Sequence, residues 1–353
     1  MRTSDFAGRA LSICAATALL AGCGGAAQPA VTSPVSFSPS TLPLVRGSGP
    51  WKMVGVPGYP EGIVRDKHGD FWVASGYYPT LTRITPRGKA TKYSIGYIPY
   101  EITLDSSGNF WLTVAVHENQ VIRVTPQLQV TSYALADYAV GGITFGGDGN
   151  VWVAENAHVG RVTPTGKVTE FPMPQGVILE GSTGVTWAPD GLVWFQTTSG
   201  LASLEPKNGH VQFYNAPRNT GGAIVPTSDH TLWYTTESTT VTLVAYNPKT
   251  QQVSTYAVPS HFGTHAAPAD MILAPDGALW LASDWYNRHT VVGALVRFDL
   301  KSKRFTTYVA PKGYDWEWDV AAGGSGTLWA TGGADAQILH VARPLFLRRN
   351  HVP

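Results

Sequence analysis

The chain has 353 residues and a formal net charge of +1, with 25 Lys and Arg against 24 Asp and Glu. This balance argues against a nucleic-acid-binding protein, which needs clustered cations to neutralise phosphates. The 43% hydrophobic and 11% aromatic content argues against disorder. High Gly and Pro (38 and 25), 12 Trp and only 4 Met favour many short strands over helices.

The first 22 residues have the features of a secretion signal. Ala10 to Ala21 form an apolar core of twelve residues, which is too short to span a bilayer. The core ends in Leu20-Ala21-Gly22-Cys23, which resembles a bacterial lipobox. The resemblance implies cleavage before Cys23 and attachment of lipid to its thiol, and an ordinary secretory signal is the alternative. We therefore expect a bacterial cell-envelope protein, anchored in the bilayer through Cys23 and facing the periplasm or the cell surface.

Residues 23–50 are rich in Gly, Ala, Ser, Thr and Pro. A segment of this composition cannot bury a core, so we expect a flexible tether between the lipid and a folded domain. Cys14 would be removed with the signal and Cys23 would be lipidated. The remaining domain then has no free thiol for a disulfide, a nucleophile or a metal site.

A tryptophan recurs in one sequence context at intervals of 39 to 49 residues. The seven positions are Trp72, Trp111, Trp152, Trp194, Trp233, Trp280 and Trp329. Most follow turns with Gly, Asp or Asn, which favour tight hairpins. Each repeat has room for four short antiparallel strands, the unit of a propeller blade. We therefore predict an all-β, seven-bladed β-propeller over residues 51–343, followed by a C-terminal tail at 344–353, with each tryptophan packed between neighbouring sheets.

The two ends of the repeat region are expected to complete each other. The seventh repeat ends after its third strand, Ile338–Val341, and the segment Trp51–Val56 resembles a fourth strand without its first three. The N-terminal strand would then complete the last blade and close the ring, which removes an unpaired sheet edge.

Strand order places the short turns of every repeat on one face and the longer, variable loops on the other. Variable loops on a rigid scaffold are where sites are usually built. Aromatic residues in the loops of the last two repeats offer flat surfaces for sugar rings or aromatic ligands. The ligand-binding candidates of this kind are Trp285, Tyr286, His289, Trp316 and Trp318, together with Tyr100 in the second repeat.

Acidic residues supply the other candidates. Asp315, Glu317 and Asp319 alternate, so an extended backbone would point them the same way and they could hold a cation. The alternative is that these three carboxylates face water. Further carboxylates are expected near the central channel, where a relocated site could recruit them: Glu61, Glu101, Glu155, Asp270 and Asp284.

The third repeat carries a family resemblance. The stretches Gly142-Ile143-Thr144, Asp148-Gly149-Asn150-Val151-Trp152-Val153-Ala154-Glu155 and Gly160-Arg161-Val162-Thr163-Pro164-Thr165-Gly166 resemble the blade repeat of the virginiamycin B lyase, or streptogramin lyase, family. The resemblance covers residues 51–343 and implies a seven-bladed propeller. Characterised members open a cyclic depsipeptide antibiotic by elimination, with a histidine base and a magnesium ion held by glutamates.

The residues that carry this activity in the family differ here. The Pro-His-Gly-Ile motif of the family reads Pro268-Ala269-Asp270-Met271, and its Trp-Phe-x-Glu motif reads Trp280-Leu281-Ala282-Ser283. The resemblance therefore implies the fold without implying the lyase reaction, and no catalytic residue is assigned.

Three hypotheses for function follow. The first is a non-catalytic propeller that binds a small molecule, glycan, peptide or partner on its loop-rich face. The second is a lyase or hydrolase with a relocated site at the channel mouth, and the third is an envelope scaffold. No cofactor is required by the first, whereas Mg or Ca would serve the second. We expect a monomer that binds no nucleic acid.

Overall fold

A computed structural model describes residues 51–341 with gaps at 57, 115–117, 180–183, 199, 218–221, 237–240, 260–265, 288–289, 311–316 and 333–336. Three short segments before this region, at 32–33, 40–42 and 44–45, are also described. The predicted signal peptide, Cys23 and the predicted tail at 344–353 lie outside the described residues. In the described part of the chain the only helical element is one 3₁₀ turn, Gly324–Gly326.

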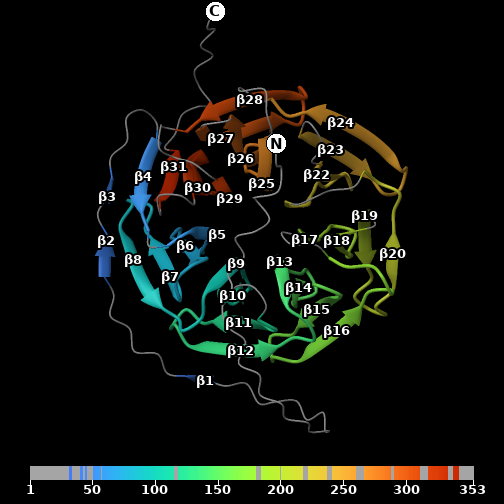
Figure 1. Cartoon of the computed structure of the whole chain (residues 1–353), viewed down its shortest axis with the longest axis horizontal. Helices are drawn as coiled ribbons and strands as arrows, with labels where there is room; N and C mark the ends of the chain where they lie inside the picture. Colours follow the sequence, from blue (N-terminus) through green and yellow to red (C-terminus); the bar gives the residue numbers. More distant parts are fainter. Residues whose placement is uncertain are drawn as a thin grey trace, which may run out of the picture.

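The strands form seven antiparallel sheets around a central axis (Figure 1). In each sheet the strand named first lies nearest the axis and the strand named last lies at the rim. The first four sheets are β5 (Pro60–Arg65), β6 (Phe71–Ser75), β7 (Thr80–Ile84), β8 (Ala90–Ser94); β9 (Pro99–Leu104), β10 (Phe110–Val114), β11 (Gln120–Val124), β12 (Val130–Ala134); β13 (Ala139–Phe145), β14 (Val151–Glu155), β15 (His158–Val162), β16 (Val168–Pro172); and β17 (Val185–Trp187), β18 (Val193–Thr197), β19 (Gly200–Leu204), β20 (Val211–Phe213).

The remaining three sheets follow the same order. They are β21 (Val225–Pro226), β22 (Leu232–Thr236), β23 (Thr242–Asn247), β24 (Gln252–Ala257); β25 (Ala266–Leu273), β26 (Ala278–Asn287), β27 (Thr290–Asp299), β28 (Arg304–Val309); and β29 (Glu317–Ala322), β30 (Leu328–Gly332), β31 (Gln337–Val341), β4 (Trp51–Gly55). The predicted all-β propeller is confirmed.

The ring closes through the N-terminal strand, as expected. β4 pairs antiparallel with β31 over five residues, from Trp51 opposite Val341 to Gly55 opposite Gln337. Strands in the predicted tether add to the outer edges of three sheets: β1 (Thr32–Ser33) pairs with β12, β2 (Ser40–Leu42) with β8, and β3 (Leu44–Val45) with β4. Composition did not predict these short pairings.

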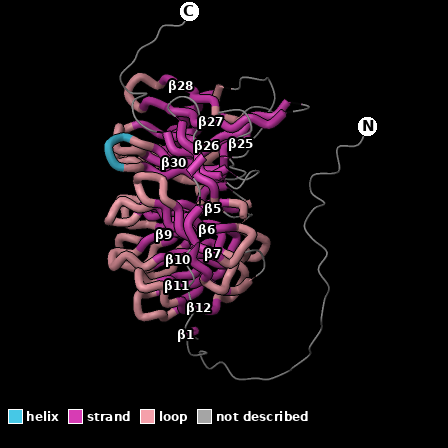
Figure 2. Tube along the Cα trace, turned by 90° about the vertical axis from the view of Figure 1, so that its left-hand side faces the viewer, coloured by secondary structure: helices cyan, strands magenta, loops and turns pink. Residues whose placement is uncertain are grey.

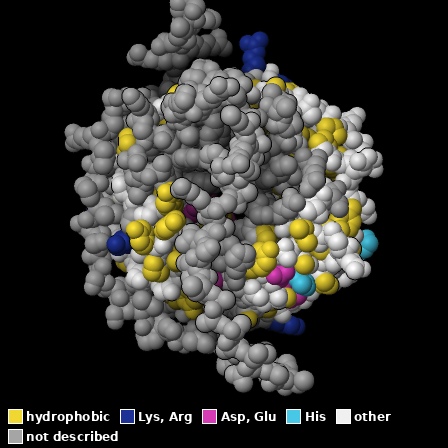
Figure 3. Space-filling model, viewed as in Figure 1, with side chains coloured by type: hydrophobic (Ala, Val, Ile, Leu, Met, Phe, Trp, Pro, Cys, Tyr) yellow, Lys and Arg dark blue, Asp and Glu magenta, His cyan; other side chains and the backbone are white. Residues whose placement is uncertain are grey.

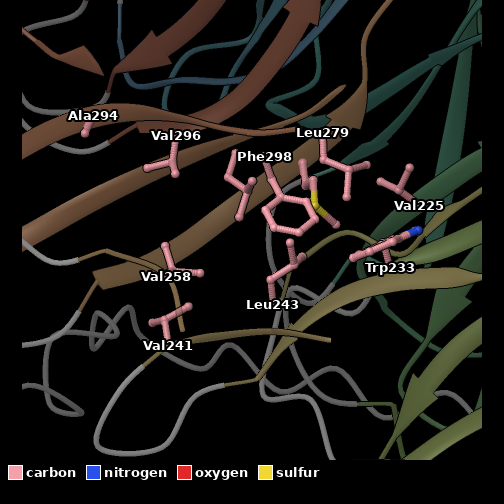
Figure 4. Close-up of a cluster of buried hydrophobic side chains, with 11 residues drawn as sticks. Val225, Trp233, Val241, Leu243, Val258, Leu279, Ala294, Val296 and Phe298 are labelled. Atoms are coloured by element: carbon pink, nitrogen blue, oxygen red, sulfur yellow. The ribbon is translucent and has the colours of Figure 1, made fainter. Parts of the chain in front are cut away.

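The recurring tryptophans are buried between neighbouring sheets, as predicted, with 6% exposure or less. Trp233 of β22 packs with Leu279 and Phe298 of the next sheet (Figure 4), and its ring centroid lies 5.5 Å from that of Phe298. Trp329 stacks on Phe71 at 4.5 Å, which joins the last sheet to the first. Burial of these rings accounts for much of the apolar surface that holds the sheets together.

The turn before each tryptophan has a second role. Its aspartate accepts a hydrogen bond from the indole N–H in five repeats, so the buried donor is satisfied. The pairs are Asp66 with Trp72, Asp105 with Trp111, Asp148 with Trp152, Asp190 with Trp194, and Asp276 with Trp280. The aspartates therefore fix the tryptophans as well as the turns.

Arginines on the third strands join adjacent sheets. Arg123 stacks over the Trp111 ring and donates to the Pro164 carbonyl in the next sheet at 2.9 Å. Arg161 does the same with Trp152 and the Pro206 carbonyl, at 3.0 Å. These arginines therefore link each sheet to the next.

Two segments expected as loops are partly strands. One is residues 284–287, at the end of β26, and the other is residues 317–319, at the start of β29. β26 continues to Asn287 and β27 begins at Thr290, so Asp284, Trp285 and Tyr286 lie on an extended hairpin. Cross-strand pairing up to Asn287 opposite Thr290 explains this difference, because Trp285 and Tyr286 pair with the β-branched residues Val292 and Val291, and residues of these types favour strands. Figure 2 shows the 3₁₀ turn on one face of the disc and strand ribbon projecting from the opposite face.

Candidate functional site

Irregular pairing marks the innermost strands at the end nearest the loop-rich face. Register shifts occur in five of the described inner strands: β5, β9, β13, β25 and β29. In each of these strands the shift lies a few residues before the residue that pairs with the repeat tryptophan. A β-bulge bends the strand and re-aims side chains, and bulges are common beside functional sites.

Acidic residues occupy four of these irregular positions. They belong to four consecutive sheets of the ring, because β25 contacts β29, β29 contacts β5, and β5 contacts β9. We call them the axial carboxyl cluster, which comprises Asp270, Asp319, Glu61 and Glu101. All four keep part of their surface exposed, and acidic side chains are visible near the centre of the loop-rich face (Figure 3).

The other inner strands carry small residues at the same level. These are Gly141 and Gly142 before the Trp152 pair, Gly184 in the next repeat, and Gly222 and Ala223 in the one after. A Cβ at Gly184 would lie 2.6 Å from the Gly222 carbonyl oxygen, so the close approach of these strands requires glycine. The axis is therefore acidic on one side and formed by small residues on the other.

Hydrogen bonds hold the two aspartates of the cluster. Asp319 Oδ2 accepts the Ile63 N–H at 2.6 Å, which links β29 to β5. The Asp319 and Asp270 carboxyls also lie within hydrogen-bonding reach of each other, the Met271 N–H donates to Asp270, and the Val320 N–H donates to Asp319 Oδ1 at 2.6 Å. Two carboxyl groups can bond in this way only when they share a proton.

Buried threonines fix the backbone at two of the bulges. The Glu101 N–H donates to Thr113 Oγ1 at 3.0 Å, and the Asp319 N–H donates to Thr331 Oγ1 at 2.9 Å. Thr113 and Thr331 each lie two residues after a repeat tryptophan, and both are 1% exposed or less. These bonds position the acidic residues on a rigid part of the fold.

The environment of the cluster favours protonated carboxyls. Desolvation raises the pKa of Glu61 to about 7. Desolvation, with repulsion from Asp270 and Glu61, raises the pKa of Glu101 to about 8. Desolvation also raises the pKa of Asp270 and, with the charge and hydrogen bond of Asp270, raises that of Asp319 well above its usual range. Carboxyls that titrate near neutral pH can bind a cation or transfer a proton.

The cluster has no basic partner in the described part of the chain. The ion pairs found there join Arg83 to Asp70 and Arg297 to Asp276 and Asp299. No group of three or more His, Cys, Asp or Glu side chains among the described residues is arranged to hold a metal ion.

A second acidic pair lies apart from the axis, in the third sheet. Glu155 at the end of β14 is fully buried, and its Oε2 accepts the Asp137 N–H at 2.9 Å. Glu170 on β16 accepts the Ala136 N–H at 3.1 Å through Oε1. The other oxygens, Glu155 Oε1 and Glu170 Oε2, meet over Gly160 of β15, where a Cβ would collide with Glu155.

The surroundings of this pair favour a protonated Glu155 carboxyl. Desolvation, the hydrogen bond to Glu170 and its charge raise the pKa of Glu155 to about 9. Glu155 was predicted from the sequence as a channel residue. Its described contacts instead join β14 and β16 to the connection between β12 and β13, so its best-supported role is structural.

Replacement of Glu155 by Gln should stabilise the protein at alkaline pH. A glutamine amide N–H donates to the Glu170 carboxylate and does not ionise. The free-energy penalty for ionising the side chain at position 155 therefore disappears. We expect a gain on the order of 1–3 kcal/mol in the free energy of unfolding at pH 9 and little change at pH 5, measured by urea denaturation. A loss of stability at both pH values, equal to that of Glu155→Ala, would contradict a protonated Glu155 carboxyl in the folded protein.

Several predicted candidates remain only partly placed. The side chains of Asp284, Trp285, Tyr286, Glu317 and Trp318 lie outside the described set, although their backbones belong to β26 and β29. His289, Asp315 and Trp316 lie outside the described residues altogether. Tyr100 precedes Glu101 on β9 and is half-buried. The shared orientation predicted for Asp315, Glu317 and Asp319 stays a prediction, and Asp319 itself contacts Asp270.

Sequence reasoning missed three tyrosines on the loop-rich face. Tyr59, Tyr77 and Tyr78 are 42%, 59% and 52% exposed. They lie before β5 and in the loop between β6 and β7. The signal that could have found them is the Tyr77-Tyr78 pair itself, which lies in the variable loop expected between the second and third strands of the first repeat.

Ring-closed four-stranded sheets and buried repeat tryptophans define the chain as an all-β propeller. A family model described as the virginiamycin B lyase family matches residues 48–178 and 96–344. The chain therefore belongs to the virginiamycin B lyase family. A virginiamycin B lyase from Nocardia farcinica (strain IFM 10152) is 30% identical over 138 residues, which are 38% of this chain and 48% of that protein. The match spans about half the length of this curated relative.

Solved structures share the fold. Selenomethionine-substituted virginiamycin B lyase from Staphylococcus aureus is 20% identical, with a TM-score of 0.68 over 83% of this chain and 99% of that one. A catalytically inactive form of the enzyme with quinupristin is 19% identical, with a TM-score of 0.68 over 88% and 100%. The extracellular domain of a hybrid two-component system protein from B. thetaiotaomicron is 16% identical, with a TM-score of 0.63 over 81% and 40%.

None of the helical structure described for this chain is long and apolar enough to span a bilayer.

Proposed function

We propose that this chain is a seven-bladed, extracytoplasmic propeller that binds a ligand with an ammonium or guanidinium group at the axial carboxyl cluster. The observation that carries the proposal is the convergence of four acidic residues from four consecutive inner strands, without a basic partner in the described part of the chain. A cationic hydrogen-bond donor would take the place of the shared protons. Its charge would offset the repulsion among the axial carboxyls, which adds to desolvation in raising their pKa values.

The family's elimination reaction is not part of this proposal. Ala269 and Ser283 stand where the family motifs have the histidine base and a glutamate. We therefore expect quinupristin, the compound named with the related enzyme, to remain intact after incubation with this protein. Lipid attachment at Cys23 and a location at the cell envelope belong to the same proposal, which the lipobox-like sequence supports.

Calorimetric titration with methylammonium at pH 6, 7 and 8 tests the function. Binding requires ionised carboxyls, so we expect affinity to rise with pH and protons to be released near pH 7. Glu101→Gln combined with Asp319→Asn should lower affinity at least tenfold, whereas Glu118→Gln on an exposed loop should not. Equal binding by all three proteins, or no binding by the wild type, would contradict the proposal.

Acid–base catalysis is a second candidate, favoured by the hydrogen-bonded Asp270 and Asp319 carboxyls. A pair that shares one proton can activate a water molecule with one group and protonate a leaving group with the other. A hydrolase of this type would show a bell-shaped pH dependence, and Asp270→Asn would abolish turnover without unfolding the protein. Turnover that is unchanged in Asp270→Asn would rule this candidate out.

A further inference from the structure

We propose that Tyr59, Tyr77 and Tyr78 form an aromatic subsite for the apolar body of the ligand whose cationic group occupies the axial carboxyl cluster. This inference rests on the proposed function and adds the chemical class of the ligand. The occupant is an organic ammonium compound that carries an aromatic or similarly flat apolar group.

Contacts tie the tyrosines to the cluster through Glu61. The Gly76 N–H donates to the Tyr59 carbonyl at 2.8 Å, which joins the approach to β5 to the loop that contains Tyr77. A Cβ at Gly76 would lie 2.7 Å from Glu61 Oε1, so the carboxyl of Glu61 lies directly against this loop. The loop that carries Tyr77 therefore lies next to the acidic group, and a backbone hydrogen bond ties it to Tyr59.

The three rings form one surface. The Tyr59 and Tyr77 centroids are 5.1 Å apart, and those of Tyr77 and Tyr78 are 6.5 Å apart in an edge-on arrangement. Backbone bonds fix the loop, because the Tyr78 N–H donates to Ser75 Oγ at 3.3 Å and the Thr80 N–H donates to the Tyr78 carbonyl at 2.6 Å. Rings held in place before binding lose little conformational entropy when a ligand arrives.

The combination of charge and aromatic surface determines the ligand class. Exposed tyrosine rings attract cations through their faces and contact flat apolar groups. The neighbouring carboxyls attract the same positive charge, so one ligand can satisfy both. A neutral glycan would stack on the rings and donate hydrogen bonds to the carboxyls but would bring no positive charge. A bare metal ion would bring charge but no flat apolar group to cover the rings.

Comparison of benzylammonium, methylammonium and benzyl alcohol by calorimetry at pH 8 tests the subsite. We expect benzylammonium to bind the wild type about tenfold more tightly than methylammonium, and benzyl alcohol to bind weakly. Tyr77→Ala should reduce the affinity for benzylammonium to that for methylammonium. Tyr77→Phe should retain the difference, because it keeps the ring.

The outcomes separate the two proposals. If methylammonium binds and depends on Glu101 and Asp319, but the benzyl group adds nothing, the aromatic subsite is overturned and the proposed function stands. If neither ammonium compound binds, the proposed function fails and the subsite fails with it. If benzyl alcohol binds as tightly as benzylammonium, the rings take neutral ligands, and the assignment to organic ammonium compounds is overturned. Thermal unfolding of Tyr77→Ala and Tyr77→Phe confirms that both variants are folded.

Discussion

Deletion of residues 51–56 is expected to abolish cooperative folding of the whole propeller. β4 supplies the outer strand that pairs with β31 along its entire length. Val54 and Val56 are 1% and 4% exposed and pack with Trp329 of the last sheet and Phe71 of the first. Burial of the two valines alone contributes about 3–6 kcal/mol, which is a large share of the stability of an ordinary domain.

A point substitution refines this prediction. Val54→Asp places an unpaired carboxylate in the closing sheet, whereas Val253→Asp places one on an exposed position of the rim strand β24, where Val253 is 42% exposed. We expect a loss of at least about 3 kcal/mol for Val54→Asp and less than about 1 kcal/mol for Val253→Asp, measured by urea denaturation. Similar midpoints for the two variants would contradict ring closure through β4.

Replacement of Glu101 by Gln is expected to change the pH dependence of stability. Glu101 has a pKa of about 8 in the folded protein against a usual value near 4.5, so the folded state holds the proton more tightly than the unfolded state. The stability from this group is therefore fully present below about pH 4.5 and is lost as pH rises through 8. Glu61 and Glu155, with pKa values of about 7 and 9, act in the same direction.

Aspartates in the turns act in the opposite direction. Hydrogen bonds to Ser302 lower the pKa of Asp299 to about 2, and hydrogen bonds from Trp111 and Asn109 lower that of Asp105. Stability from these groups is present above their unfolded pKa and is lost as pH falls through the folded value. We therefore expect maximal stability of the wild type near pH 5.

Glu101→Gln should raise the free energy of unfolding at pH 9 by about 1–3 kcal/mol and leave it nearly unchanged at pH 5. Urea denaturation at the two pH values checks this, with Glu118→Gln as the matched control, because Glu118 lies exposed away from the axis. A uniform effect of Glu101→Gln at both pH values would show that the carboxyl is already ionised at neutral pH.

The architecture could be predicted from the sequence because short-range interactions specify each repeat. Turn residues and buried tryptophans recur in register, and their physical roles are short-range: hairpin geometry, an Asp-to-indole hydrogen bond and packing between adjacent sheets. Closure by Trp51–Val56 was also predictable, since an unmatched strand and an incomplete repeat lie at the two ends.

The site was only partly predictable. Glu61, Glu101 and Asp270 were recognised as candidates because the repeat pattern places them near the central channel. Asp319 was assigned to a different group with Asp315 and Glu317, because an alternating pattern says nothing about a bulge that turns one carboxyl toward another repeat. Glu155 was placed near the channel, although Gly160 gives it space to reach Glu170 on an outer strand. Contacts between residues far apart in sequence decide both cases.

Titration of the Asp and Glu side-chain carboxyl carbons by NMR, without ligand and with benzylammonium, tests the central claim most directly. We predict that the wild type has axial carboxyls with midpoints near pH 7 and pH 8 in addition to the Glu155 midpoint near pH 9, that Glu101→Gln removes the one near pH 8, and that benzylammonium shifts the remaining axial midpoints downward. Ionisation of all axial carboxyls below pH 5, with no shift on addition of benzylammonium, would contradict the account.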